Sequence, residues 1–483
     1  MRDATAIARE LKEKKISHGE LIQQIQQRVE VENPRLNALV TFEPSLLSSS
    51  AYSVESEHPL AGMFFPLKML GQEKKGWSAT AGSRLLKNHR ASRNSNYVTQ
   101  LEKIGLIPLG QTNAPEFGFK NITDPKIYGS AKNPWDTTLS PGGSSGGAAA
   151  TVASGIFPIA GASDGGGSIR IPASFCGLIG LKPSRGTMPV GPQAWRGWQG
   201  APVDFALTIS MRDTQTLFEG MRTIHSGAPY QVSAARWQTH PKKQKLTIAV
   251  CYNSPVGTKV SAEAIQAVKD ASRFLEQEGH QLIEIEYPLN GRELIDSYYL
   301  MNGAETANML HQMELSLGRP ILAGEIEPMS WAIFQYGKKL SAAAYIDSLS
   351  KWDHAAIRME ELFQRFDAFL SPTTATTAPR LDHTYQTSAI KQRMATIEKY
   401  PVNYALETIT LMFEESLAIT PFTQLANLTG QPAISLPTHR TQTGLPLGVQ
   451  FMAARGREDI LFQLGYLFEQ EQKFYLPKVY HPS

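Results

Sequence analysis

Residues 164–168 read Asp-Gly-Gly-Gly-Ser and place a hydroxyl directly after three glycines. Consecutive glycines leave backbone N–H groups free to converge on one point, and such donors can stabilise the oxyanion of a tetrahedral intermediate. Ser168 is then expected beside the donors, where a serine can act as nucleophile. Asp164 and Arg170 flank the turn and are expected to hold its ends as an ion pair. A glycine-rich turn with a capping serine is the alternative, and this run alone leaves both open.

The glycines of the chain gather in the same region. Residues 142–186 are 45 in number and hold 12 of the 38 glycines, where an even distribution would put about 3.5. Glycine costs backbone entropy, so this density indicates unusual backbone conformations or a close approach to another group.

Residues 142–146, Gly-Gly-Ser-Ser-Gly, match the G-x-S-x-G pattern of a nucleophile elbow. That motif needs a strand before the serine and a helix after it. Residues 133–136 and 140–141 are rich in Asn, Pro and Asp, which favours a loop instead. None of the 11 histidines lies within residues 142–186, which counts against a Ser-His-Asp hydrolase. No Walker A lysine follows the glycines, so phosphate binding is poorly supported too.

One lysine, Lys68, lies in the apolar run 59–70, which predicts a buried strand. Burial in such a run lowers the pKa of a lysine.

Further elements must position these groups. Two amphipathic helices are predicted in the first forty residues; Ser17 and Glu20 have the spacing of a capping box, and Asn33-Pro34 is expected to end the second helix. A strand–helix–strand unit is predicted at 246–252, 261–277 and 280–286, with later strands at 366–372, 433–436 and 447–453 and a closing helix at 459–471. This alternation predicts an α/β fold.

We expect residues 1–45 to form an N-terminal helical segment packed on a catalytic domain of residues 46–483.

Composition excludes several classes of protein. The chain has 483 residues, of which 42% are hydrophobic, and a net charge of +3, which does not favour a nucleic-acid partner. Cys176 and Cys251 are too few for a disulfide framework or a thiolate metal site. Charges near the N-terminus replace the apolar core of a signal peptide, and no apolar run approaches the roughly 20 residues of a membrane span. The expectation is a soluble, cytoplasmic globular protein that does not bind membranes.

The sequence from Pro141 to Gly186 closely resembles the amidase signature family. Further matches lie at 110–113, 133–135, 366–373, 429–433 and 444–450, so the resemblance covers most of the chain and is weak at about 215–340. It implies the fold of that family, a mixed central β-sheet covered by helices on both faces. It also implies hydrolysis of a carboxylic amide C–N bond without a metal or organic cofactor.

The resemblance carries three catalytic residues to this chain. Ser168 matches the nucleophile that forms a covalent acyl-enzyme, Ser144 the bridging serine that relays the proton, and Lys68 the base. In the family a cis peptide bond precedes the bridging serine, here Gly143-Ser144.

The resemblance also implies an oxyanion hole formed by the backbone amides of Gly165, Gly166, Gly167 and Ser168. Two positions depart from the family pattern. Met69 follows the lysine where many members have an acidic residue, and Gly165 stands where a bulkier residue is common. Residues 113–119 and 164–168 are most similar to the branch that contains nylon-oligomer cyclic-dimer hydrolase.

Two further functions are compatible with the same resemblance: the glutaminase subunit of a tRNA-dependent amidotransferase, and a non-catalytic binding protein. The expected partner is a small-molecule amide, with aryl, fatty, peptide and lactam-derived amides all open, and a homodimer is left open. Trp195, Trp198 and Tyr128 are candidates for substrate contact, with core packing as the alternative for each.

Overall fold

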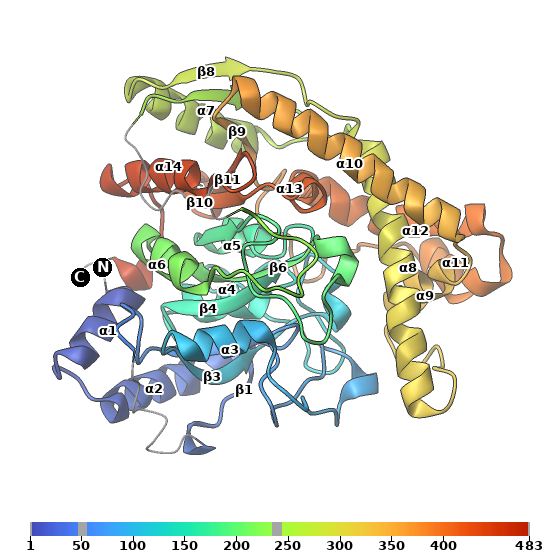
Figure 1. Ribbon diagram of the computed structural model, residues 1–483, viewed down its shortest axis with the longest axis horizontal. Coiled ribbons are helices and arrows are strands. Elements are labelled where there is room, and N and C mark those ends of the chain that lie inside the picture. Colours follow the sequence, from blue (N-terminus) through green and yellow to red (C-terminus); the bar gives the residue numbers. More distant parts are fainter. Residues whose placement is uncertain (1, 47–55, 234–243, 482–483) are drawn as a thin grey trace.

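The computed structural model describes residues 2–46, 56–233 and 244–481, whose strands form two sheets (Figure 1). The larger sheet has eight strands in the order β4-β6-β5-β10-β11-β9-β7-β8, and the smaller has three in the order β1-β3-β2. The strands are β1 (Leu39–Thr41), β2 (Phe64–Lys68), β3 (Ile107–Thr112), β4 (Ile159–Asp164), β5 (Ile179–Lys182), β6 (Val203–Thr208), β7 (Thr247–Val250), β8 (Gln281–Glu284), β9 (Ala368–Pro372), β10 (Ala433–Arg440) and β11 (Pro446–Ala453). The larger sheet is mixed, because β7 pairs in parallel with β8 and β9 while its other pairs are antiparallel.

Helices cover both faces of the larger sheet. The helices of the described chain are α1 (Ala4–Lys12), α2 (His18–Leu36), α3 (Asn96–Lys103), α4 (Gly146–Ala153), α5 (Arg170–Cys176), α6 (Met211–Met221), α7 (Ala262–Gln277), α8 (Gly291–Leu317), α9 (Pro328–Gly337), α10 (Ala342–Arg365), α11 (Ser388–Ala395), α12 (Val402–Ile419), α13 (Gln424–Thr429) and α14 (Glu458–Gln470). The expectation of an α/β fold with a mixed sheet between helices is confirmed.

Strand β11 shows how the two faces differ. Val449 and Phe451 point into the main hydrophobic core with α7 and α14, whereas Met452 packs with α10 and α13 on the other face. Gln450 shares the face of Met452, and its side chain accepts a hydrogen bond from Arg170 at the start of α5. Alternate residues of one strand therefore pack on opposite faces of the sheet.

The N-terminal helices form as predicted, with one correction. Ser17 and Glu20 make the expected capping box at the start of α2. Pro34 does not end this helix, which continues to Leu36. The extra turn buries Leu36 completely, and the Oδ1 atom of Asn33 accepts hydrogen bonds from the two amides beyond the helix. Burial and this side-chain cap outweigh the hydrogen bond that a proline lacks.

The predicted strand around Lys68 is β2, and all of its residues are buried. The strand–helix–strand unit is β7, α7 and β8, each within three residues of the predicted bounds. Within the described residues, the structure contains no helix that is long and apolar enough to cross a lipid bilayer.

Candidate active site

Lys68 ends β2 in a fully buried position. Its Nζ atom lies 2.7 Å from the Oγ atom of Ser144 and 2.8 Å from the Oγ atom of Ser163. Burial lowers the pKa of Lys68 to about 7, although the carboxylates of Asp204 and Asp164 act in the opposite direction. A substantial fraction of this amine is therefore neutral near pH 7, as a general base requires.

Ser144 lies in the loop before α4, and no strand lies between β3 and this loop. The Gly143–Ser144 peptide bond is cis, as the resemblance implies. A Cβ atom on Gly143 would come within 2.5 Å of the carbonyl oxygen of Ile122, so only glycine fits there. The amide of Ser145 donates to the carbonyl of Ser168 over 3.2 Å and joins the two serine-bearing loops. The prediction of a loop, rather than a nucleophile elbow, is confirmed.

Asp164 and Arg170 form the expected ion pair in a fully buried position. The guanidinium makes two hydrogen bonds of 2.9 Å to the carboxylate and further bonds to Gln450 and Asn427. Burial raises the pKa of Asp164, but the charge and hydrogen bonds of Arg170 outweigh it and hold the pKa at about 2. The turn that carries Ser168 is thus fastened to the sheet and to α13.

The backbone amides around Ser168 differ from the expectation at one position. The amide of Gly167 donates to the Oδ1 atom of Asp164 over 2.7 Å. Gly167 therefore offers no free donor, because the carboxylate that anchors the turn already occupies its N–H. In the described part of the chain, the amides of Gly165, Gly166 and Ser168 have no acceptor, so three donors of the turn that carries Ser168 remain.

Ser144 and Ser168 line one cavity of about 840 Å³. No hydrogen bond joins their two hydroxyls within the described residues. Catalytic hydrogen bonds are often loose before substrate binds, so this separation is compatible with a proton relay.

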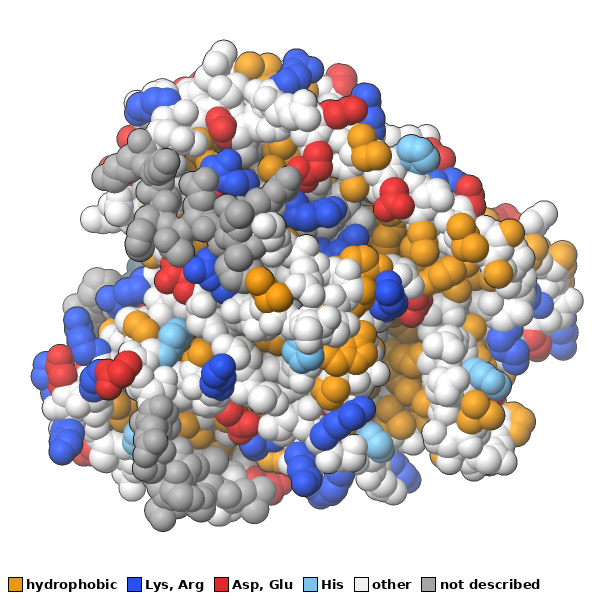
Figure 2. Space-filling view, in the orientation of Figure 1, with side chains coloured by type: hydrophobic (Ala, Val, Ile, Leu, Met, Phe, Trp, Pro, Cys, Tyr) orange, Lys and Arg blue, Asp and Glu red, His pale blue; other side chains and the backbone are white. Residues whose placement is uncertain are grey.

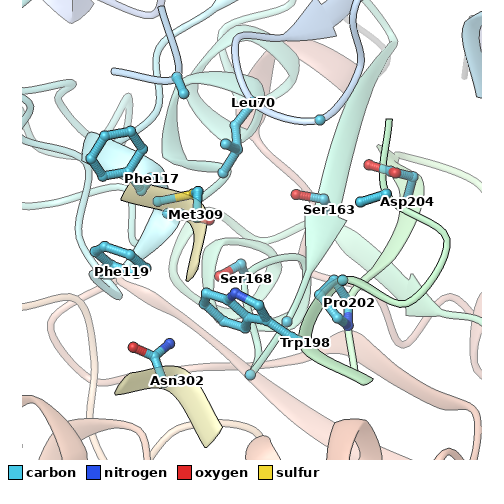
Figure 3. Close-up of a pocket in the computed structure, with 18 of the residues that line it drawn as sticks. Leu70, Phe117, Phe119, Ser163, Ser168, Trp198, Pro202, Asp204, Asn302 and Met309 are labelled. Atoms are coloured by element: carbon cyan, nitrogen blue, oxygen red, sulfur yellow. The ribbon is translucent and has the colours of Figure 1, made fainter. Parts of the chain in front are cut away.

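The cavity wall beyond the serines is largely apolar (Figure 3). Leu70, Phe117, Phe119, Trp198 and Met309 are among the side chains drawn around it. Its polar end, next to Ser163 and Asp204, lies against β4 and β6.

The three candidates for substrate contact differ in their position relative to the cavity. Trp195 and Trp198 both line the cavity, as expected. Tyr128 is not among the described residues that line it, and its hydroxyl instead lies 2.8 Å from the Oγ1 atom of Thr80. The structure therefore gives Tyr128 a hydrogen bond outside the cavity and no position in the described cavity wall.

Sequence analysis does not identify two polar side chains that lie next to Lys68 in the structure. Ser163 directly precedes Asp164 on β4. Asp204 on β6 is the register partner of Ser163. Burial raises the pKa of Asp204 to about 6, and the nearby Lys68 opposes that rise. Its Oδ1 atom is inaccessible and has no hydrogen-bond partner in the described part of the chain. Asp204 therefore supplies a carboxylate near Lys68 from another strand, whereas the position after the lysine holds Met69.

Among the described residues, no group of three or more His, Cys, Asp or Glu side chains is arranged to hold a metal ion.

Comparisons with known proteins agree with one another. The family model described as Amidase matches residues 20–462. A lipoamidase of Enterococcus faecalis is 38% identical over 484 residues; the match covers 99% of this chain, which spans 65% of the length of that relative. A 6-aminohexanoate-cyclic-dimer hydrolase of a Pseudomonas species is 30% identical, with 97% of this chain and 94% of the relative covered. The structure of a 6-aminohexanoate cyclic dimer hydrolase complexed with substrate matches with a TM-score of 0.85 at 28% identity, covering 99% of this chain and 98% of the other.

Proposed function

The chain belongs to the amidase signature family, whose hydrolases act on amide C–N bonds, and from this premise we propose that it hydrolyses a small-molecule amide through an acyl-Ser168 intermediate. The observation that carries the proposal is the 2.7 Å contact between Lys68 Nζ and Ser144 Oγ, fully buried at the wall of the cavity that Ser168 also lines.

In the proposed reaction, the Oγ atom of Ser168 attacks the amide carbon. Its proton passes to the Oγ atom of Ser144, whose own proton passes to the neutral Nζ atom of Lys68. The amides of Gly165, Gly166 and Ser168 stabilise the resulting oxyanion.

The intermediate then collapses and breaks the C–N bond. The leaving amine takes a proton that returns from Lys68 through Ser144. Water next attacks the acyl-Ser168 ester and loses a proton along the same path, which releases the carboxylate and restores the serine.

The apolar wall of the cavity supports a substrate with a chain-like apolar group next to the scissile amide. The names of the relatives point the same way, since one is a lipoamidase and another a hydrolase of the 6-aminohexanoate cyclic dimer. We propose an amide with an extended, flexible hydrocarbon segment as the substrate class.

The domain division expected from the sequence is also part of the proposal. Contacts between α1 and α6 support the packing of residues 1–45 on residues 46–483: the carboxylate of Asp213 accepts hydrogen bonds from the amides of Ala4 and Thr5. The cytoplasmic location and the homodimer stay predictions.

The test of the proposed function is covalent labelling with a fluorophosphonate probe, followed by peptide mass mapping. We expect labelling at Ser168, its loss in Ser168→Ala and a sharp decrease in Lys68→Ala. Ser154→Ala is the matched control, since Ser154 is a buried serine at the C-terminal end of α4 that does not line the cavity.

Labelling at Ser144 would contradict the assigned roles, and no labelling of folded protein would contradict the hydrolase. A panel of chain amides, aryl amides and glutamine then defines the substrate. Turnover of glutamine alone would favour the glutaminase subunit over the proposed amidase.

A further inference from the structure

The turn 164–168, here called the oxyanion loop, has peptide units whose orientation can be deduced from their carbonyl contacts. The cis bonds of the described chain lie elsewhere, at Gly143–Ser144 and Gly191–Pro192. In a planar trans peptide the C=O and N–H groups point in opposite directions. A hydrogen bond that holds a carbonyl on one side therefore directs the N–H of the same unit to the other side.

Two of the free donors are oriented by neighbours of the loop. The carbonyl of Asp164, in the unit that carries the Gly165 amide, accepts from the Nδ2 atom of Asn427 over 2.8 Å. The carbonyl of Gly167, in the unit that carries the Ser168 amide, accepts from the amide of Ile171 over 2.8 Å.

The Gly166–Gly167 unit is occupied at both ends. Its carbonyl accepts from the Oγ1 atom of Thr423 over 2.7 Å, and its N–H donates to Asp164. This unit fastens the loop and offers nothing to a substrate.

The remaining unit joins Gly165 to Gly166 and carries the third free donor. Its carbonyl accepts a hydrogen bond from the hydroxyl of Tyr298 over 3.2 Å. We propose that Tyr298 is a positioning residue of the oxyanion hole, which aims the Gly166 amide at the developing oxyanion by holding the Gly165 carbonyl. This inference rests on the proposed function of Ser168.

Tyr298 comes from α8, in the part of the chain where the family resemblance is weak. Burial raises the pKa of its hydroxyl well above the usual value, so the group stays protonated and acts as a donor. Its ring meets that of Trp198 edge to face at 6.1 Å, and Trp198 in turn stacks on Phe119 at 6.0 Å. The aromatic contacts hold the ring, so the hydroxyl has a defined place over the loop.

Gly165 and Gly166 have no side chains, and this lets the rings of Trp198 and Tyr298 come close to the oxyanion loop. A Cβ atom on Gly166 would come within 2.8 Å of the Tyr298 hydroxyl oxygen, and one on Gly165 would lie 3.4 Å from the Trp198 ring. Trp198 thus lies where a side chain at position 165 would extend, and Tyr298 where one at position 166 would. The departure from the family pattern at Gly165 therefore fits the ring of Trp198, which in turn contacts Tyr298.

The experiment compares wild-type protein with Tyr298→Phe, which removes only the hydroxyl. Loss of a whole oxyanion donor costs about 10²–10³ in rate, and loss of its orientation alone should cost less. We expect kcat to fall about 10-fold with KM within about twofold. Binding of a trifluoromethyl ketone analogue, which forms a tetrahedral adduct with the serine, should weaken by a similar factor.

Tyr480→Phe is the matched control. The Tyr480 hydroxyl also donates to a backbone carbonyl, that of Val152, over 2.7 Å, but Tyr480 does not line the cavity. Its loss should leave kcat and analogue binding unchanged, even if the melting temperature falls. Unchanged kcat and analogue affinity in Tyr298→Phe would overturn the inference, and so would a rise in KM alone, which would make Tyr298 a substrate-binding residue.

A double-mutant cycle with Gly166→Ala adds a second measurement. The new methyl group meets the hydroxyl oxygen at 2.8 Å, whereas the next nearest atom of Tyr298 is its Cζ atom at 3.3 Å. Gly166→Ala should therefore reduce kcat by a larger factor in the wild type than in Tyr298→Phe. Strictly independent factors would contradict the contact on which the inference depends.

The two proposals fail in different ways. A wild-type protein that turns over no amide and is not labelled at Ser168 defeats the proposed function. An active wild-type enzyme with an equally active Tyr298→Phe variant defeats only the role of Tyr298.

Discussion

The serine-bearing loops (141–170) and the helical wall formed by α8 (Gly291–Leu317) and α12 (Val402–Ile419) border the same cavity but are built differently. In the loops, the proposed relay Ser144 and nucleophile Ser168 lie within one short stretch of the chain, which is held by buried hydrogen bonds and the Asp164–Arg170 ion pair. In the wall, cavity residues recur along one face of α8, as Tyr298, Asn302, Met309 and Met313 do. Figure 2 shows hydrophobic side chains along the hollow between this helical part and the rest of the molecule.

The difference has an energetic consequence. A buried charge or a proton path fails almost completely when one member is removed, since no solvent can replace it. An apolar wall loses affinity in small steps, because each side chain contributes in proportion to its contact area. Substitutions in the loops should therefore abolish turnover or stability, and substitutions in the wall should change affinity and substrate preference.

The largest effect is expected for Lys68→Met. Without the base, kcat for an amide should fall by about 10⁴-fold or more, as when a member of another serine-hydrolase triad is removed. Lys182→Met is the matched control: Lys182 is also fully buried, and its pKa lies well below the usual value, but its Nζ atom contacts only the carbonyl of Pro183 among the hydrogen bonds of the described chain. Equal losses in the two variants would contradict the special role of Lys68.

Arg170→Met should destabilise the fold by about 3–5 kcal/mol, because it leaves the Asp164 carboxylate buried without a cation. Chemical denaturation at pH 7 measures the change. The low pKa of Asp164 depends on Arg170, so in the variant this pKa rises and the carboxyl can become neutral on acidification. The difference from wild type should therefore shrink as the pH falls from 7 to 5.

The control for that comparison is Arg319→Met, which removes a surface ion pair with Glu325. Solvent already screens this pair, so we expect no measurable change. A loss at Arg319 as large as that at Arg170 would show that burial is not what makes the loop pair important.

A smaller, graded effect is expected in the wall. Met309→Ala should raise KM for a long-chain amide about 5–10-fold and leave kcat within about twofold, because a pocket methylene contributes roughly 1–3 kcal/mol. Short amides that do not reach Met309 should be unaffected. Leu315→Ala serves as the control, since Leu315 is 63% exposed on the same helix and does not line the cavity. A fall in kcat for all amides would contradict the division between loops and wall.

The smallest effect is a shift in the pH profile. Lys68 must be neutral to accept a proton, so kcat should rise with pH through its pKa of about 7. Lys68 is faced by the carboxylates of Asp204 on β6 and Asp164 on β4, and both raise its pKa. Asp204→Asn removes one of them and should move the rising limb toward lower pH by about one unit or less.

Glu73→Gln tests the specificity of that shift, because Glu73 acts on Asp204 and is not among the carboxylates that act on Lys68. Its profile should stay within a few tenths of a unit of the wild type. A shift toward higher pH in Asp204→Asn would contradict the proposed pairing of this carboxylate with Lys68.

Much of the structure of the serine-bearing loops can be predicted from local spacing in the sequence. The glycine run, the ion pair of residues six positions apart and the buried strand around Lys68 all depend on neighbours in the chain, and the structure contains each of them. The capping box at Ser17 and the β7-α7-β8 unit are local for the same reason. Short-range geometry limits the conformations of such segments, so the sequence by itself predicts them.

Only the tertiary structure decides which groups meet across the sheet and the helices. Asp204 reaches Lys68 through strand pairing, Tyr298 reaches Gly165 from α8 across 133 positions, and Asn427 of α13 reaches the Asp164 carbonyl across 263 positions. None of these contacts has a periodic or motif signal in the chain. They exist because the mixed sheet and the packing of α5, α8 and α13 bring distant residues within hydrogen-bond distance, and burial then makes each of those contacts energetically important.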